Sequence, residues 1–181
     1  MIETERLILR PWEERDRESY AALNTDPEVM HDYPVLPERV WVDAKFDRYT
    51  EHFSDHGFGR WMLERKSDGA VLGYTGIMPM RLGHPFEEGM EIGWRLARAA
   101  WGHGYASEAA RAALADGFGR LGFEEVLAYT AETNVRSQAV MRRSGMNHDP
   151  ARDFHHPDQG DGLSLRRWVV YAATPQTWQA P

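Results

Sequence analysis

The spacing of apolar positions changes several times along this chain, and each change marks an expected element. Residues 60–66 (RWMLERK) and 70–80 (AVLGYTGIMPM) follow a period of two around a turn at 67–69, which predicts a β-hairpin. Four more stretches have the composition of strands: ETERLILR, MEIGWRL, EEVLAYTAE and SLRRWVVYAA, at residues 3–10, 90–96, 124–132 and 164–173. The polar segment 147–162, which Pro and Gly interrupt, is expected to be a loop.

Helical spacing marks four other segments. Residues 16–23 and 37–57 are expected to be helices, and Gly57 ends the second one. A third helix is expected after residue 104, where one face carries Ala106, Ala109, Ala110, Ala113, Leu114, Phe118 and Leu121. Its small residues imply a close approach to the sheet beneath it. A short helix within residues 134–145 ends at Gly145.

The order of these elements predicts an α/β arrangement. One strand and two helices precede an antiparallel meander of three strands, and a helix, a strand, a helix and a last strand follow. This order gives a mixed sheet with helices packed on it. The length of 181 residues suits one domain, and no repeat or linker divides the chain, so residues 1–181 are expected to form a single domain.

Composition and charge narrow the classes of function. With 21 Lys and Arg against 28 Asp and Glu, the net charge is −7, which argues against nucleic-acid or membrane binding driven by overall charge. The absence of cysteine excludes disulfides and a cysteine nucleophile. No apolar run approaches the ~20 residues of a membrane span, and the charged N-terminus lacks a signal-peptide pattern, so a cytoplasmic protein is expected. His148, His155 and His156 have no fixed ligand spacing, so no metal is expected.

The stretch AAWGHGYASEAARAALADGFGRLGF at residues 99–123 places two glycines directly before the third helix. Glycines and a fresh helix N-terminus can form an anion site, although a tight turn would explain the same residues. A phosphate-binding P-loop would need Lys-Ser or Lys-Thr where Tyr105 and Ala106 stand. A dinucleotide fingerprint would need Gly or Ala at Ser107, so an NAD(P)-binding oxidoreductase is the weakest alternative.

WGHGYASEA after the strand MEIGWRL resembles the pyrophosphate-binding loop of GNAT-type acyl-CoA N-acyltransferases. Residues 3–12 (ETERLILRPW), the segment NVRSQAVMRRSGM and the stretch DFHHP resemble parts of the RimJ/RimL-like subgroup, in the same order. The resemblance implies the GNAT fold, which is a mixed, mostly antiparallel sheet that splays between two parallel strands and carries helices on both faces. The strand at 90–96 should therefore splay from the strand at 124–132 and open a wedge for the pantetheine arm of acetyl-CoA.

The resemblance also implies the residues that bind the cosubstrate. Those expected to bind acetyl-CoA are Ile92, Trp94, Leu96, Arg98, Gly102, His103, Gly104, Tyr105, Ala106, Ser107, Asn134, Ser137 and Arg142. Backbone amides of the glycine stretch would hold the diphosphate, and Arg98 stands next to Ala99, where the family often has Arg or Gln. Residues 136–143 carry three arginines and no acid, which suits a polyanionic ligand, although the favourable interaction of cations with a helix C-terminus would explain Arg142 and Arg143 equally well. Asn134 is also the expected N-cap of its helix.

Acyl transfer from a thioester to an amine needs a neutral amine, donors for the oxyanion and a proton for the departing thiolate. Many relatives place a tyrosine where Met141 stands, and a thioether cannot donate a proton, so Ser137 is the expected thiolate partner. The alternative is that Ser137 is an ordinary residue of the first helical turn after the Asn134 cap. Glu91 is the expected base, acting through water, although a salt-bridged face residue is equally open. His156 is the rival base, because its ordinary pKa of ~6.5 suits proton transfer.

The function implied is an N-acetyltransferase that moves an acetyl group from acetyl-CoA to a primary amine by direct attack. A catalytically silent acyl-CoA-binding sensor is the main alternative. The sequence leaves the acceptor amine open, and it also leaves the oligomeric state open, with a homodimer among the alternatives.

Overall fold

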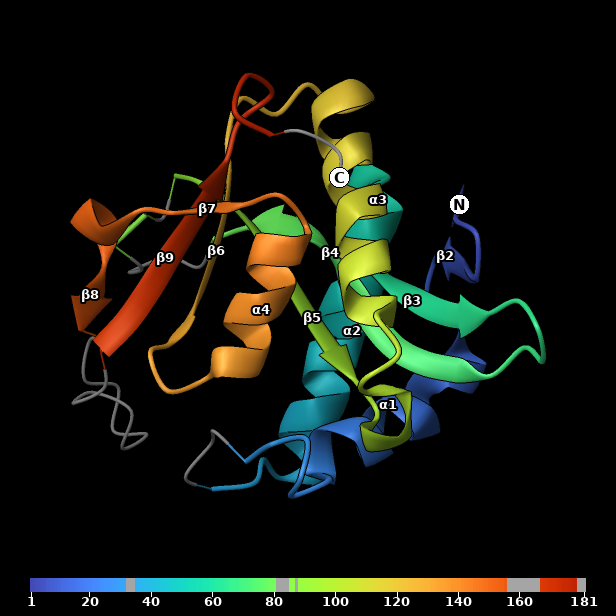
Figure 1. Cartoon of the computed structure of the whole chain (residues 1–181). Coiled ribbons are helices and arrows are strands. Elements are labelled where there is room, and N and C mark those ends of the chain that lie inside the picture. Colours follow the sequence, from blue (N-terminus) through green and yellow to red (C-terminus); the bar gives the residue numbers. More distant parts are fainter. Residues whose placement is uncertain (32–34, 81–84, 87, 156–166, 179–181) are drawn as a thin grey trace.

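A computed structural model describes residues 1–31, 35–80, 85–86, 88–155 and 167–178, and one twisted sheet runs through it (Figure 1). The strands among these residues are β1 (Ile2–Glu3), β2 (Leu7–Arg10), β3 (Arg60–Arg65), β4 (Val71–Pro79), β5 (Met90–Leu96), β6 (Val126–Ala131), β7 (Asn147–His148), β8 (Phe154–His155) and β9 (Arg167–Ala173). Their order is β1-β2-β3-β4-β5-β6-β9-β7, with β8 also on β9. The pair β5–β6 is parallel and the other described pairs are antiparallel, which confirms the expected mixed sheet.

Helices cover both faces of this sheet. They are α1 (Arg17–Thr25), α2 (Arg39–His56), α3 (Tyr105–Gly119) and α4 (Val135–Arg143), with the short 3-10 helices η1 (Glu14–Asp16), η2 (Arg98–Ala100) and η3 (Pro150–Arg152). In Figure 1, α3 and α4 lie together on one side of the sheet, and α1 and α2 lie on the other. None of the described helices combines the length with the hydropathy that a membrane span requires.

Two expectations about strands are wrong. The strand expected at 3–10 is divided, because the backbone turns at Thr4, whose N–H donates to Leu7 O at 3.0 Å, and β1 folds back on β2. The loop expected at 147–162 contains β7 and β8, which both pair with β9. Each of these strands is two residues long, which is too short to show a period-two pattern in the sequence. Both strands therefore depend on their pairing with β9. Residues 156–166 lie outside the described residues, and β9 begins at Arg167 within them.

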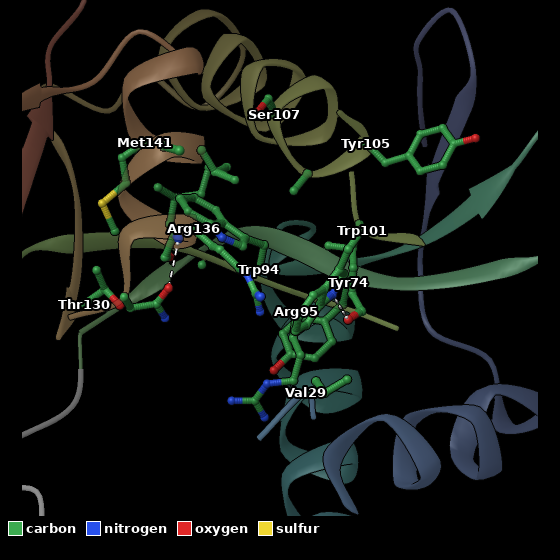
Figure 2. Close-up of a pocket in the computed structure, with 18 of the residues that line it drawn as sticks. Val29, Tyr74, Trp94, Arg95, Trp101, Tyr105, Ser107, Thr130, Arg136 and Met141 are labelled. Atoms are coloured by element: carbon green, nitrogen blue, oxygen red, sulfur yellow. Dashed lines mark hydrogen bonds between the residues drawn. The ribbon is translucent and has the colours of Figure 1, made fainter. Parts of the chain in front are cut away.

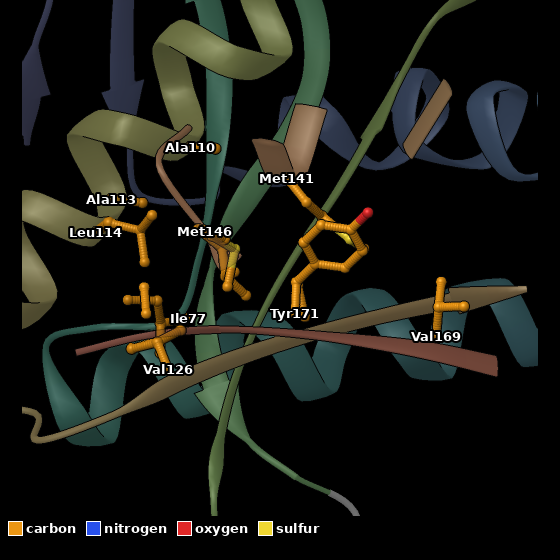
Figure 3. Packing of buried hydrophobic residues seen from close by; sticks show 12 residues of the cluster. Ile77, Ala110, Ala113, Leu114, Val126, Met141, Met146, Val169 and Tyr171 are labelled. Atoms are coloured by element: carbon orange, nitrogen blue, oxygen red, sulfur yellow. The ribbon is translucent and has the colours of Figure 1, made fainter. Parts of the chain in front are cut away.

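The small residues of α3 let the helix approach the sheet closely, as expected. Ala109, Ala110, Ala113 and Leu114 are buried, and they belong to clusters that reach the sheet strands. A Cβ built on Gly117 would lie 2.6 Å from Ile77 Cδ1, so no larger residue fits there without a shift. Figure 3 shows the core on this side, with side chains from α3, α4 and the sheet in one layer.

Aromatic rings fill the core on the other side. Trp12, Tyr20, Phe46, Tyr49 and Tyr74 pack with ring centroids between 5.3 and 6.3 Å apart, several of them edge to face. Such contacts add to the burial of the rings themselves. This cluster packs α1 and α2 against β3 and β4.

Candidate functional site

A cleft opens where the two parallel strands diverge. The β5–β6 pairing is recorded at Glu91 and Leu127, whereas β5 pairs with β4, and β6 with β9, along their lengths. The expected splay is therefore confirmed. The cleft has a volume of about 810 Å³, within the usual range for small-ligand sites. We call it the β5–β6 cleft, and Figure 2 shows part of its lining.

The glycine loop, residues 101–104, joins η2 to the start of α3 at one end of this cleft. Gly102 and Gly104 have φ values of +81° and +80°, a left-handed backbone that glycine adopts without steric cost. Gly104 is the N-cap of α3 and provides no side-chain cap. Among the described residues no acceptor is recorded for the backbone N–H groups of residues 102–107, whereas the Glu108 N–H donates to Gly104 O at 3.0 Å. A row of unsatisfied donors thus coincides with the positive end of the α3 dipole.

Most of the expected cosubstrate-binding residues lie together on the wall of this cleft. Those that line it are Ile92, Trp94, Leu96, Arg98, Gly102, Gly104, Tyr105, Ala106, Ser107, Asn134 and Ser137. The Tyr105 ring points away from the other labelled side chains (Figure 2), so this residue offers the cleft its backbone. Two expected residues lie elsewhere among the described ones. His103 is outside the lining, and Arg142 donates to the Tyr171 hydroxyl at 2.9 Å.

The first turn of α4 forms the opposite wall. The Asn134 side chain accepts the Ser137 N–H at 3.0 Å, so the expected N-cap is confirmed. Ser137 lines the cleft, and the sulfur-bearing side chain of Met141 is buried in the same wall. Arg136 of α4 reaches the glycine loop, with its guanidinium carbon 4.8 Å from the centre of the Trp101 ring. Arg98 lies over the same ring at 5.0 Å, so two cations meet at this end of the cleft.

Glu91 lies at the point where the strands separate and is paired with a buried cation. Its Oε1 atom accepts a hydrogen bond from Arg60 of β3, and its side chain is 18% exposed. Arg60 also donates to Gly93 O at 3.4 Å and to Gly76 O. Burial would lower the pKa of Arg60, but the charge of Glu91 and three nearby tyrosines raise it, so Arg60 stays charged. A Cβ on Gly93 would lie 3.0 Å from this guanidinium, which explains glycine at that position.

The half of the cleft that faces α1 and α2 was not predicted from the sequence. It is lined by Lys45, Tyr49, Arg60, Tyr74, Arg95, Tyr129 and Trp168. The period of two in β3 does place Arg60 on the same face of the strand as Met62, which points inward. A charged residue on an inward face was the one sign in the sequence that Arg60 belongs to the site. Nothing in the sequence pairs it with Glu91, because that contact spans β3, β4 and β5.

The histidines do not form a metal site among the described residues. His148 Nε2 lies 3.1 Å from Asp153, and His155 belongs to β8. No group of three or more potential metal ligands occurs in the part of the chain that the structure describes. His156, the rival base, lies outside the described residues, so its role stays a prediction.

Comparisons with known proteins agree on one family. The model of the acetyltransferase (GNAT) domain matches residues 6–147. The Bacillus subtilis (strain 168) protein YkkB, described as uncharacterized, is 36% identical over 150 residues, which cover 80% of this chain and 84% of that protein. The FsC-acetyl coenzyme A-N(2)-transacetylase of Aspergillus fumigatus is 31% identical, in a match that covers 98% of this chain and 77% of that protein. The crystal structure of an acetyltransferase from Agrobacterium tumefaciens str. C58 superposes with a TM-score of 0.77 at 27% identity, over 95% of this chain and 92% of that one.

Proposed function

Because this chain belongs to the GNAT acetyltransferase family, we propose that it moves an acetyl group from acetyl-CoA to a primary amine while both substrates are bound. One observation carries the proposal: among the described residues no acceptor is recorded for the N–H groups of residues 102–107, and all of these residues except His103 line a cleft that continues between β5 and β6. Diphosphate is the part of coenzyme A that such a row of donors suits. The name of the Aspergillus fumigatus relative includes acetyl coenzyme A, which supports the same cosubstrate.

The diphosphate would bind to the amides of Gly102, His103, Gly104, Tyr105 and Ala106, with Ser107 in the first turn of α3. Arg98 and Arg136 stack on Trp101 beside this loop and would attract further phosphate charge. The amide of His103 belongs to this set although its side chain lies outside the cleft lining. The contribution of Arg142 stays a prediction, since its guanidinium bonds Tyr171.

The acyl arm would follow the open edge of β5. Beyond Glu91 no pairing with β6 is recorded among the described residues, so every second backbone amide of β5 faces the cleft there. Ile92, Trp94 and Leu96 form the adjoining wall. A backbone N–H of this edge would polarise the thioester carbonyl and stabilise the oxyanion that forms during attack.

Glu91 would prepare the amine for attack. The described structure records Arg60 on Oε1 and no partner on Oε2, so the second oxygen is available to a water molecule or to the amine. The acceptor ammonium passes a proton to Glu91 through water, and the neutral nitrogen then attacks the thioester carbon. The tetrahedral intermediate releases its surplus N–H proton to water and collapses to the amide as the carbon–sulfur bond breaks. The Ser137 hydroxyl donates a proton or a hydrogen bond to the departing thiolate. Solvent restores the proton to Ser137.

The test is the release of free coenzyme A from acetyl-CoA, measured with a thiol reagent across a panel of primary amines that includes peptides with free N-termini. We expect release with at least one amine, and a large loss of turnover in Glu91→Gln. Tight binding of CoA without release for any amine would favour the silent sensor instead. A thermal shift with NAD(P)H and none with CoA would support the oxidoreductase alternative. Membership of the RimJ/RimL-like subgroup, a homodimer and the single-domain extent 1–181 stay predictions.

A further inference from the structure

Arg6 lies in the turn between β1 and β2 and contacts the glycine loop from outside the cleft. Its Nη1 atom donates to His103 O at 2.9 Å, and its guanidinium carbon lies 4.7 Å from the centre of the Tyr105 ring. A Cβ built on Gly104 would lie 3.5 Å from Arg6 Nη2. Neither Arg6 nor His103 is among the described residues that line the cleft. The arginine therefore supports three consecutive residues of the loop from behind.

The hydrogen bond to His103 O fixes the direction of a particular amide. In a trans peptide the carbonyl and the N–H of the next residue point in opposite directions, and no cis peptide occurs among the described residues. With the His103 carbonyl held toward Arg6, the N–H of Gly104 points away from Arg6. Gly104 lines the cleft on its other side, so this N–H is turned toward the cleft. A loop with glycine at both 102 and 104 would otherwise rotate this peptide easily.

Glu108, in the first turn of α3, anchors Arg6. Glu108 Oε2 accepts from Arg6 Nε at 2.7 Å, and Oε1 accepts from the Arg6 N–H at 2.9 Å and from Thr4 Oγ1 at 2.6 Å. Burial raises the pKa of Glu108, but these hydrogen bonds outweigh it, so the pKa lies below its ordinary value and the carboxylate is ionised at neutral pH. Its negative charge offsets that of Arg6. The arginine accordingly affects the loop by orienting and holding its backbone more than by adding positive charge.

We propose that Arg6, anchored by Glu108, is a positioning residue that aims the Gly104 amide at the diphosphate of acyl-CoA. This inference rests on the proposed function, because it assumes that the glycine loop binds that diphosphate. It assigns a role to the opening stretch ETERL, in which Thr4 bonds Glu108 of α3 and Arg6 bonds His103 of the glycine loop, each roughly a hundred residues later in the chain.

The experiment compares two thioesters in the intact chain. Acetyl-CoA contains the diphosphate, and acetyl-pantetheine lacks it. For Arg6→Lys and Arg6→Met we expect the Kd of CoA, from calorimetry, and the KM of acetyl-CoA to rise by about tenfold. The kcat with acetyl-CoA and the kcat/KM with acetyl-pantetheine should stay at the wild-type values. Arg6→Lys keeps a cation for Glu108 but lacks the planar fork that also reaches His103, so it tests direction with the charge preserved.

Arg120→Met is the matched control. Arg120 lies at the opposite end of α3 and forms an ion pair with Asp116 at 2.6 Å, so its loss removes a comparable surface pair far from the loop. We expect wild-type binding of CoA in this variant. Unchanged CoA affinity in both Arg6 variants, or an equal loss with both thioesters, would overturn the positioning role. A wild-type chain that fails to bind CoA would instead overturn the proposed function itself.

Discussion

Replacing Gly104 by alanine tests whether the left-handed backbone of the glycine loop is needed for binding. Gly104 has φ +80° and ψ 1°, a conformation that costs an L-residue about 1–2 kcal/mol. The new Cβ would come within ordinary contact distance of Arg6 Nη2, at 3.5 Å, so the cost lies in the backbone and not in a clash. If the free loop relaxes to relieve this strain, CoA binding must restore the strained backbone of the bound loop. The binding free energy of CoA then weakens by up to about 1–2 kcal/mol, so the Kd of CoA rises by up to about 5- to 30-fold.

Gly122→Ala provides the control for this strain. Gly122 has φ +69° and no atom within 4 Å of a built Cβ, and it lies between α3 and β6, outside the cleft lining. Urea unfolding, followed by tryptophan fluorescence, should show a loss of about 1–2 kcal/mol of unfolding free energy for Gly122→Ala. Gly104→Ala should lose less, because its free loop relaxes and the strain returns only when CoA binds. Calorimetry should show weaker CoA binding for Gly104→Ala alone. Wild-type affinity in Gly104→Ala, together with the same loss of stability as in Gly122→Ala, would refute the reasoning.

Three further outcomes are expected. Ser137→Ala should lower kcat by about a hundredfold, because the thiolate loses its proton donor. The KM of acetyl-CoA should stay unchanged, because the backbone N–H that bonds Asn134 is retained. An unchanged kcat in the thiol assay would remove Ser137 from the mechanism. Asn134→Ala should cost about 0.5–2 kcal/mol of stability in urea, and Asn134→Asp less, since it keeps an acceptor; equal losses would contradict the capping role. Glu108 has a lowered pKa in the folded chain, so its stabilising effect is complete above its ordinary value of 4.5 and is lost as the pH falls through the folded value. The difference in unfolding free energy between wild type and Glu108→Gln should therefore narrow in acid, and a difference independent of pH would show that ionisation is irrelevant.

The positions of the glycine loop and of the α4 cap follow from local patterns. Two glycines before an alanine-rich helix, and an asparagine three residues before a serine, depend on backbone conformation within a few residues. The same holds for the helices and for the longer strands, whose apolar periods are local. The splay of β5 from β6 was expected from a family resemblance, and the structure confirms it at the pairing of Glu91 with Leu127.

Partners distant in sequence could not be inferred in this way. Arg60 and Glu91 meet through two intervening strand pairings, and Arg6 reaches His103 only after β1 has folded back on β2. Arg136, and not Arg142, reaches the glycine loop, because the direction of each side chain depends on how α4 sits against the sheet.

The sequence by itself determined the helices and the longer strands, the glycines that permit the loop and the residues able to donate or accept protons, because each depends on near neighbours along the chain. Only the tertiary structure decided which charges are paired, which amides are left without partners and which aromatic side chains form the α1–α2 half of the cleft. Those features depend on the register of the sheet and on the packing of helices across its two faces, and a single stretch of sequence contains neither.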